Sequence, residues 1–535
     1  MKYVHLIGLS LLVANCSPQQ YRAQADKEVY SILKKAEKHV YGKSKNFSIN
    51  NEYSSRDPQS VKSDEILQKS LSGGTLTLSI DQAISYGSRY SRDYQGQKER
   101  LYLAALSLSG TEHSYSPNFS GTAGIKGRKL SNEETQGTTN GRLGVRQALL
   151  AGGSYSLSLA NDLLKFFTGD PRRSASSVIS LNILQPLLRG AGKDIAAERL
   201  TQSNRNVIYA LRDFNQYQNE FSRDIVIQYL RLLQQKESVQ NELKNYESRK
   251  ANTEYLRARA VDRASPQEVS DSEQGELQAK NRWINAKSRY QTSLDSFKLT
   301  LGMPTSTKIV LLDSELQRIE KAGLHPIRMT HQQAFRTALR HRLPLLNDID
   351  RFEDTKRQVL ISADQLKADV NLVSTSSLRN TADSYEKFNF NNLSTEIGLE
   401  LNLPINRKNE RNNYRRSLIS FSSGIRSLSR SYDSLNNLVK QRLREIEQFR
   451  QSYKIQKGAL ALAEKRVEGN KLRFQAGTLI FRRLSESQDA LISAQNAVTA
   501  ALIDYQRARL QLYTDIGILD VDKNAYWLKS NPVRR

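Results

Sequence analysis

Residues Leu184–Asp194 have the sequence LQPLLRGAGKD, which combines a proline, two glycines and a lysine. A phosphate-binding P-loop has the pattern G-x-x-x-x-G-K-[ST], in which backbone N–H groups surround the phosphates and a hydroxyl group binds magnesium. Counting back from Gly192 and Lys193, the first glycine of that pattern falls on Leu187 and the hydroxyl falls on Asp194. The stretch is therefore not a P-loop, and its glycines must serve another purpose.

The segments on either side of this stretch indicate a corner between a strand and a long helix. Val178–Leu184 has the alternation of a strand, and Asp194–Arg259 has a helical pattern about 100 Å long at 1.5 Å per residue. Pro186 lacks a backbone donor and so ends strand pairing, whereas Gly190 and Gly192 permit tight backbone angles. We expect the aspartate that begins the helical pattern to cap the helix.

Other segments alternate in the same way, which predicts strands with one apolar and one polar face. The alternation is strict in Ser154–Leu159 and in Glu396–Leu403, where Glu396 and Glu400 share the polar face. Leu403-Pro404 then predicts a second corner, and Gln147–Gly153 predicts a short hairpin turn. Most segments approach the ~9–11 residues of a tilted membrane strand, although a small soluble β-sandwich is an alternative. Weaker alternation occurs in Phe119–Lys126, Leu143–Leu149, Val178–Leu184 and Val370–Leu378.

Apolar residues recur every seven positions in the long helical segments, as in a coiled coil, with one interruption at Gln218 in the first of them. In the last helix, small residues stand three positions after the large ones, which allows a neighbouring helix to approach closely. Arg407–Gln475 would also extend about 100 Å. The large residues are Leu211, Ile225, Leu232, Val239 and Tyr246, then Val439, Ile446, Tyr453, Leu460, Val467 and Phe474, and finally Leu484, Leu491, Val498, Tyr505 and Leu512.

The two halves of the chain repeat one order of elements: helix, strands, very long helix, short break and long helix. The first helix is predicted over Leu78–Leu108, and the breaks fall at Val261–Pro266 and Ala476–Leu479. Such a repeat indicates one architecture that occurs twice. We predict a signal peptide at 1–15, a polar, extended or poorly ordered arm at 16–73 with a helical patch near Ala23–Val40, repeats at 74–302 and 328–518, a connector at 303–327 that is partly strand-like at Lys308–Leu312, and a tail at 519–535.

The N-terminus has the features of an export signal. A basic start precedes the apolar run Val4–Val13 and then Ala14-Asn15-Cys16, which is similar to a bacterial lipobox in which Cys16 is lipidated. Asn15 departs from that pattern, so a plain signal peptide with an incidental cysteine is the alternative. No later stretch approaches the ~18–20 apolar residues of a membrane-spanning helix.

Composition and motifs argue against enzymes and nucleic-acid binding. The 535 residues include 80 Lys and Arg against 55 Asp and Glu, a net charge of +25, but no arginine-rich run or zinc-finger spacing. There are six histidines, and the chain has no G-x-S-x-G motif and no Cys/His metal spacing. We therefore expect no catalytic residue, cofactor or metal. The positive charge would suit contact of the long helices, or of the ends of the strands, with anionic lipid or a protein partner.

Several stretches together resemble the TolC-like outer membrane factor family over residues 74–518. They are Gly74–Leu78 before a helix, the corner sequence QPLLRGAG, Leu399–Pro404, and Arg473–Tyr513, which begins RFQAGTLIF. The resemblance implies a homotrimer in which an outer membrane β-barrel continues into a long periplasmic α-helical coiled-coil tunnel. It also implies a bacterial outer membrane exit duct of a tripartite efflux pump or type I secretion system, with a periplasmic adaptor, an inner-membrane transporter and outer membrane lipid as partners.

The strands favour several copies independently of the resemblance. Two strands in the second half and two to four in the first cannot close a barrel, because the smallest membrane barrels use about eight and open edges are not tolerated in lipid. Three chains would supply twelve or eighteen strands. We favour twelve; eighteen would require Leu143–Leu159 as an additional hairpin.

The resemblance also implies a periplasmic constriction at the two helix breaks. A ring of Arg483 would favour anions and a ring of Glu486 would favour cations. The alternative is that these positions are solvated loops or adaptor-docking residues. The residues that fall on the family's gate positions are Phe474, Gly477, Thr478, Leu479, Arg483 and Glu486 in the second repeat, and Asp262 and Glu268 in the first.

A periplasmic lipoprotein scaffold made of coiled coils is the second hypothesis for the whole chain. The strands discriminate between the two, since a scaffold has no reason to keep Glu396 and Glu400 opposite Ile397, Leu399 and Leu401.

Overall fold

A computed structural model of the chain describes residues 17–44, 46–129, 135–166, 173–259, 265–380, 387–522 and 525–528. The expected signal peptide at 1–15, Cys16 and Asp262 lie outside these residues. The chain divides into two compact units, which are described separately. The first contains residues 1–48, 100–211 and 347–429, and the second contains residues 49–99, 212–346 and 430–535.

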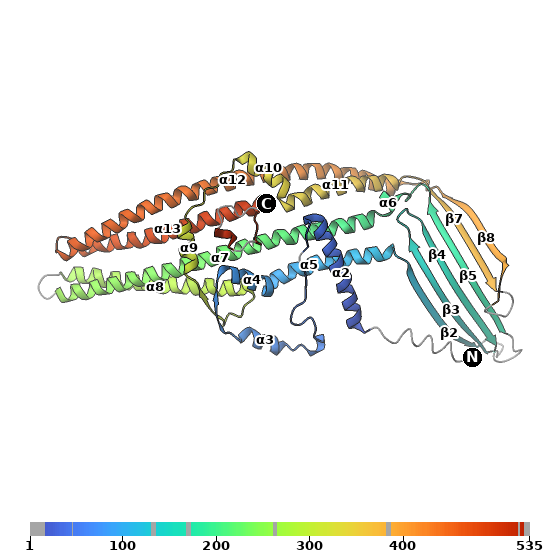
Figure 1. Ribbon diagram of the computed structural model, residues 1–535, viewed down its shortest axis with the longest axis horizontal. Helices are drawn as coiled ribbons and strands as arrows, with labels where there is room; N and C mark the ends of the chain where they lie inside the picture. The colour runs from blue at the N-terminus through green and yellow to red at the C-terminus, as the bar shows by residue number, and fades with distance from the viewer. Residues whose placement is uncertain are drawn as a thin grey trace. The chain divides into compact units, whose positions relative to one another are not determined.

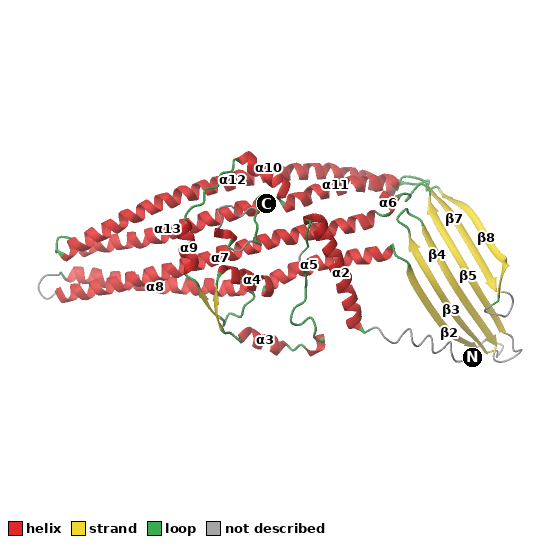
Figure 2. Ribbon diagram, viewed as in Figure 1, coloured by secondary structure: helices red, strands yellow, loops and turns green. Residues whose placement is uncertain are grey.

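The first unit contains an antiparallel sheet of six long strands in the order β2-β3-β4-β5-β7-β8 (Figures 1 and 2). Strands from both halves of the sequence meet where β5 pairs with β7. The outer strands are β2 and β8. The bounds are β2 Asn118–Lys129, β3 Thr135–Ala148, β4 Ser154–Phe166, β5 Arg173–Pro186, β7 Asp369–Asn380 and β8 Phe388–Asn402.

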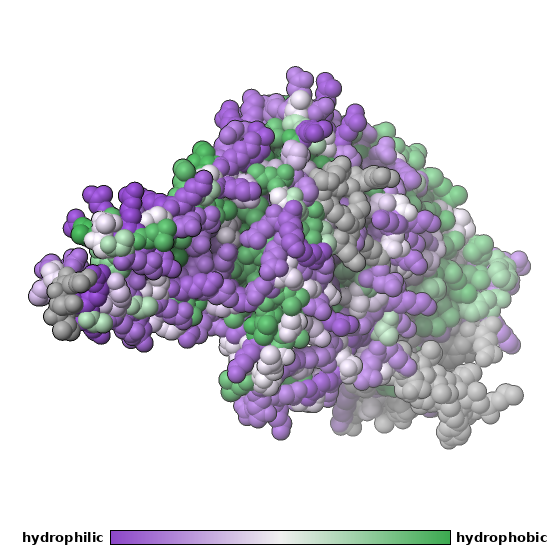
Figure 3. All heavy atoms as spheres, turned by 60° about the vertical axis from the view of Figure 1, so that its left-hand side comes forward, coloured by the Kyte–Doolittle hydropathy of each residue, from purple (hydrophilic) through white to green (hydrophobic). Residues whose placement is uncertain are grey.

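The register places apolar side chains on one face across all six strands. Leu157 of β4 stands between Val145 of β3 and Leu181 of β5, and Leu399 of β8 stands opposite Leu372 of β7. Figure 3 shows apolar atoms gathered over the strands. The other face holds polar pairs, which include Ser158↔Ser180, Asn182↔Thr375 and Glu400↔Asn371.

Four strands per chain, the number that we favoured, is wrong because the additional hairpin is present. β3 and β4 pair along their whole length, and the predicted turn between them is closed by Leu149 N–H donating to Gly153 O at 2.7 Å. β3 is rich in glycine and polar residues, so its apolar alternation is weak in the sequence. Six strands per chain correspond to eighteen in a trimer.

The corner sequence lies where expected, with one difference. β5 ends at Pro186, and Gly190 and Gly192 have φ of 78° and 93°, values that favour glycine. Asp194 does not cap a helix, because the short helix α6 (Lys193–Ala196) has Gly192 at its N-cap and no side-chain cap bond. The carboxylate of Asp364 instead accepts a hydrogen bond from Gly190 N–H at 2.7 Å and holds the corner. The second corner follows β8, where Pro404 O accepts a hydrogen bond from Arg407 Nε at 3.1 Å.

The expected polar arm is more ordered than its composition indicates. Residues Pro18–Tyr41 form α2, which starts with a capping box at Ser17 and buries Val29 and Leu33. Tyr102 of α5 (Arg92–Ser114) donates a 2.7 Å hydrogen bond to Asp26. The apolar residues of α2 are sparse but share one side, so a mostly polar segment still packs as a helix.

The second unit contains a small parallel sheet, helical hairpins and the C-terminal segment. β1 (Thr75–Leu78) pairs with β6 (Lys308–Leu311), a long-range pairing that the local pattern of Gly74–Leu78 does not reveal. The helix expected over Leu78–Leu108 is interrupted at Ser91, which is extended, so α4 (Ile80–Tyr90) precedes α5. The remaining elements that lie within this unit are the 3₁₀ helix η1 (Pro58–Ser60), α3 (Ser63–Leu71), α8 (Pro266–Leu301), α9 (Ser314–Ala322), α10 (His331–His341), α13 (Phe481–Asp515) and the 3₁₀ helix η2 (Tyr526–Leu528).

The helices repeat in length between the two halves of the sequence. α4 and α10 have 11 residues each and begin with capping boxes at Ser79 and Thr330. α5 and α11 (Leu343–Asp364) have 23 and 22 residues. α7 (Glu198–Arg259) and α12 (Lys408–Gln475) have 62 and 68, and α8 and α13 have 36 and 35. None of the helices in the described residues has an apolar stretch sufficient to cross a membrane.

Candidate gate at the helix-hairpin ends

The turn between α12 and α13 is built around Gly477 and Thr478. Gly477 has φ of 76°, and its N–H donates to Phe474 O at 3.0 Å. Thr478 donates twice to Arg473 O, from its N–H at 3.0 Å and from its hydroxyl at 3.1 Å. These bonds satisfy the last carbonyl groups of α12, so both predicted residues shape the turn.

An apolar cluster joins this hairpin to the α7–α8 hairpin of the first repeat. The buried side chains are Leu256, Phe474, Phe481 and Leu484, and Val269 and Leu479 pack against them. The ring of Phe474 lies 5.9 Å from Tyr255 and 6.1 Å from Phe481, measured between centroids. Phe474 and Leu479 therefore hold the two hairpins together through apolar contacts.

The predicted charged residues have different surroundings. Arg483 and Glu486 are exposed, and the carboxylate of Glu486 lies 3.7 Å from the guanidinium of Arg482. Glu268 completes a capping box at the start of α8, because its carboxylate accepts from Ser265 N–H at 3.4 Å. Glu268 is thus a capping residue, whereas Arg483 keeps an exposed positive charge at the start of α13.

A charged network that the sequence reasoning missed lies further along the same helices. Arg249 of α7 is 2% exposed, and its Nη2 lies 2.8 Å from the Asp489 carboxylate of α13. Arg282 of α8 lies 3.0 Å from the other Asp489 oxygen and 3.4 Å from Glu242. Arg249 also donates to the hydroxyl and carbonyl oxygens of Ser485. One carboxylate therefore ties α13 to both helices of the other hairpin.

Burial lowers the pKa of Arg249, and the charge of Asp489 acts in the opposite direction. A guanidinium starts from so high a pKa that it stays charged at physiological pH. A buried charge of this kind is tolerated only while it is paired, so loss of the pairing carboxylate is costly.

Close packing fixes the position of Arg249. A side-chain carbon added at Gly275 of α8 would lie 2.8 Å from Arg249 Nη1. One turn further along α7, the buried hydroxyl groups of Thr253 and Ser272 lie 2.8 Å apart. Small residues on α8 therefore leave room for the guanidinium.

The sequence does contain a signal for this network. Glu242 and Arg249 stand seven residues apart, three positions after Val239 and Tyr246 of the heptad pattern. The same stripe begins with Phe214 and is apolar again at Leu256. Charged residues at core-facing heptad positions indicate a specific buried pairing.

The two hairpins leave a cavity of about 520 Å³ between α7, α12 and α13, beside the apolar cluster. Its lining includes Lys244, Asn245, Asn252, Lys471 and Gln488. Among the described residues, the side-chain nitrogen atoms of Asn245 and Asn252 find no hydrogen-bond partner. The contact between the hairpins is therefore incomplete, with an apolar part and a polar, loosely packed part.

No family model matches the sequence, and no curated protein matches it. Solved structures do match. The Campylobacter jejuni CmeC outer membrane channel has 12% identity and a TM-score of 0.60 over 82% of this chain and 85% of that chain. The outer membrane protein VceC of Vibrio cholerae has 13% identity and a TM-score of 0.58 over 82% and 96%. The open state of the Neisseria gonorrhoeae MtrE outer membrane channel has 10% identity and a TM-score of 0.58 over 82% and 88%.

At these identities the comparison establishes the fold. The chain has the fold of TolC-like outer membrane factor channels, with their mixture of helices and sheet, as the sequence resemblance predicted.

Proposed function

We propose that the chain is a passive exit duct of a bacterial outer membrane. The observation that carries this proposal is the six-stranded sheet, in which every strand contributes apolar side chains to one face and the other face is mostly polar. Its strands have 12 to 15 residues, enough for the ~9–11 that a tilted membrane strand needs. An apolar face of this extent suits lipid, and the polar face suits a water-filled bore.

The two outer strands of this sheet support a closed assembly of several copies. Unpaired strand edges cannot face lipid, so β2 of one copy would pair with β8 of the next. A homotrimer would then close a barrel of eighteen strands. The repeats at 74–302 and 328–518, the connector at 303–327 and lipidation at Cys16 belong to the same proposal.

The gate is proposed to lie where the two hairpins meet. The apolar cluster around Phe474 and the ion pairs of Asp489 would hold the bore closed, and partner proteins would open it by separating the hairpins. An efflux or type I secretion system, with a periplasmic adaptor and an inner-membrane transporter, would supply those partners.

The assembly is tested by extracting the full-length protein from membranes. We expect it to require detergent, to migrate as a trimer without boiling and to collapse to a monomer when heated. A protein that leaves the membrane fraction without detergent and migrates as a monomer would instead favour the lipoprotein scaffold.

A further inference from the structure

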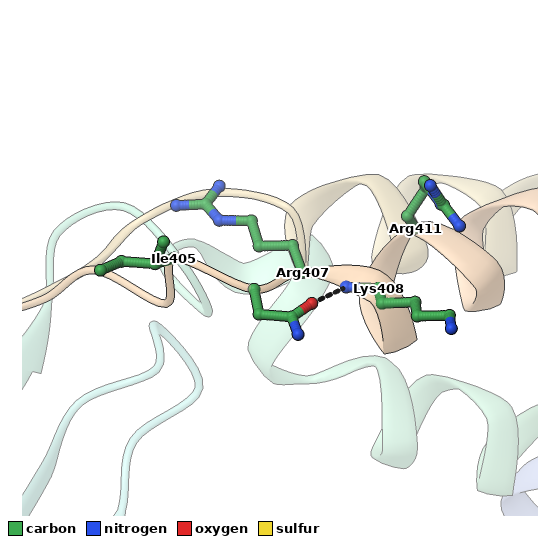
Figure 4. Close-up of a pocket in the computed structure, with 5 residues that line it drawn as sticks. Ile405, Arg407, Lys408 and Arg411 are labelled. Atoms are coloured by element: carbon green, nitrogen blue, oxygen red, sulfur yellow. Dashed lines mark hydrogen bonds between the residues drawn. The ribbon is translucent and has the colours of Figure 1, made fainter.

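The corner between β8 and α12 carries a concentration of positive charge. Residues 404–416 contain Arg407, Lys408, Arg411, Arg415 and Arg416 against the single acid Glu410. Figure 4 shows Ile405, Arg407, Lys408 and Arg411 along this turn, around an open recess of about 500 Å³. The local excess of charge is therefore much larger than the chain average.

Three cations line this recess, Arg407, Lys408 and Arg411, and of these Arg407 holds the turn. The guanidinium of Arg407 donates to the carbonyl groups of Pro404 and Leu366 and so fixes the turn. Lys408, Arg411 and Arg415 are exposed and follow one stripe of α12 at spacings of three and four residues. Within the described part of the chain, no carboxylate forms an ion pair with these three, and the Arg411 guanidinium donates to the neighbouring Asn412 at 3.3 Å.

Exposed apolar side chains adjoin these cations. Ile405 is fully exposed, and Leu401 and Leu403 are more than half exposed and lead to it from the apolar face of β8. The first corner, where Gly190 donates a hydrogen bond to Asp364 of α11, also exposes Leu187 and Leu188. An apolar surface that ends in unpaired cations matches the chemistry of an acyl chain that ends in a phosphate.

We propose that this corner binds the headgroup of an anionic phospholipid, a site that rests on the proposed insertion of the sheet into a membrane. Lys408, Arg411 and Arg415 bind the phosphate, and the acyl chains pack on Ile405 and Leu403. Basic residues beside a membrane segment attract anionic lipids in this way. The backbone N–H groups at the start of α12 add to the attraction.

A second copy of the chain fits the cations less well. Closure of the sheet would bring the start of β2 beside the end of β8. The residues there, Tyr115–Asn118, contain no acidic side chain, and the last twelve residues of α5 before them contain one acid, Glu112, against the three cations. Charge complementarity therefore favours a lipid phosphate at this corner.

The test uses the full-length protein in lipid nanodiscs and counts retained lipid by native mass spectrometry. We expect phosphatidylglycerol to bind more tightly than phosphatidylcholine, and inorganic phosphate not to compete at millimolar concentration. The variant Lys408→Gln/Arg411→Gln/Arg415→Gln should bind phosphatidylglycerol more weakly than the wild type, by a factor of about ten or more. The matched control Lys440→Gln/Arg444→Gln/Arg466→Gln removes the same charges from exposed positions further along α12 and should bind like the wild type.

The outcomes separate this site from the proposed function. Equal retention of the two lipids, or equal binding by the triple variant, in protein that inserts normally would overturn the lipid site alone. A protein that does not enter the nanodisc would overturn the duct as well. A photo-crosslinker at position 405 should acquire the mass of a lipid, and an adduct with a second chain would show that another copy covers the corner.

Discussion

Asp489 is the residue whose loss should affect the gate most, because its two carboxylate oxygens pair with Arg249 and Arg282 on the other hairpin. Asp489→Asn would leave the buried Arg249 without its charge partner. Since the carboxylate itself is about half exposed, we expect a moderate loss of about 1–3 kcal/mol in the contact between hairpins. Single-channel recording should show longer openings than in the wild type.

Glu486→Gln is the matched control for the contact between hairpins, because within the described residues its carboxylate forms one ion pair, with the exposed Arg482 of its own helix. We expect it to behave like the wild type. Unchanged openings in Asp489→Asn would mean that the charged network does not close the bore.

Arg483 should influence which ions pass the constriction. It is exposed at the start of α13, and the only predicted tip carboxylate in that helix, Glu486, is paired with Arg482. A ring of three Arg483 side chains would favour anions, so Arg483→Glu should move the reversal potential in a salt gradient towards cations. Lys440→Glu makes the same charge change at an exposed position of α12 and should leave the reversal potential in place. Equal shifts in the two variants would remove Arg483 from the gate.

At the scale of elements, β8 offers a direct comparison between the two faces of the sheet. Ile397→Lys places a charge on the apolar face, which costs about 2–4 kcal/mol near the middle of a bilayer. Glu400→Lys places the same side chain on the polar face and should be tolerated. The yield of heat-resistant oligomer in membranes measures both, and equal yields would contradict the assignment of faces.

The C-terminal segment is held through buried polar groups that no sequence pattern reveals. The guanidinium of Arg509 in α13 is fully buried and donates to Trp527 O. The ring nitrogen Nε2 of His325 lies 3.1 Å from Leu528 O. Burial, together with the charge of Arg509, lowers the pKa of His325 from its ordinary 6.5.

This lowered pKa predicts a loss of stability in mild acid. Below pH 6.5 the unfolded chain binds a proton at His325 more readily than the folded chain does, so the stabilisation present above that pH declines as the pH falls. His325→Gln keeps a donor for Leu528 O but cannot titrate. Thermal unfolding from pH 8 to pH 5 should therefore show a steeper decline in the wild type than in the variant. Parallel curves would contradict the prediction.

Local patterns predicted the elements that depend on neighbours in sequence. The strict alternation of Ser154–Leu159 and the heptads of α12 and α13 are visible because one side of each element is consistently apolar. The glycines of β3 hide its alternation, and the pairing of β1 with β6 joins residues more than 200 positions apart. Asp489 and Arg249 are similarly distant, so the sequence showed a charged heptad stripe without showing its partner.

At the scale of the whole molecule, the proposed duct requires that the apolar face meets lipid and that the helices enclose water. Each chain supplies six strands with open edges, and three chains are the number that the family resemblance implies. The open edges and the apolar face are both properties of the sheet, and a closed assembly in lipid would satisfy both.

Single-channel recording from the purified full-length protein in planar lipid bilayers shows whether the assembly encloses a water-filled bore. We expect discrete conductance steps from a trimeric sample. The wild type should show small steps, and the openings of Asp489→Asn should last longer. A sample that inserts into the bilayer but never conducts, in the wild type and in the variant alike, would contradict the proposed duct.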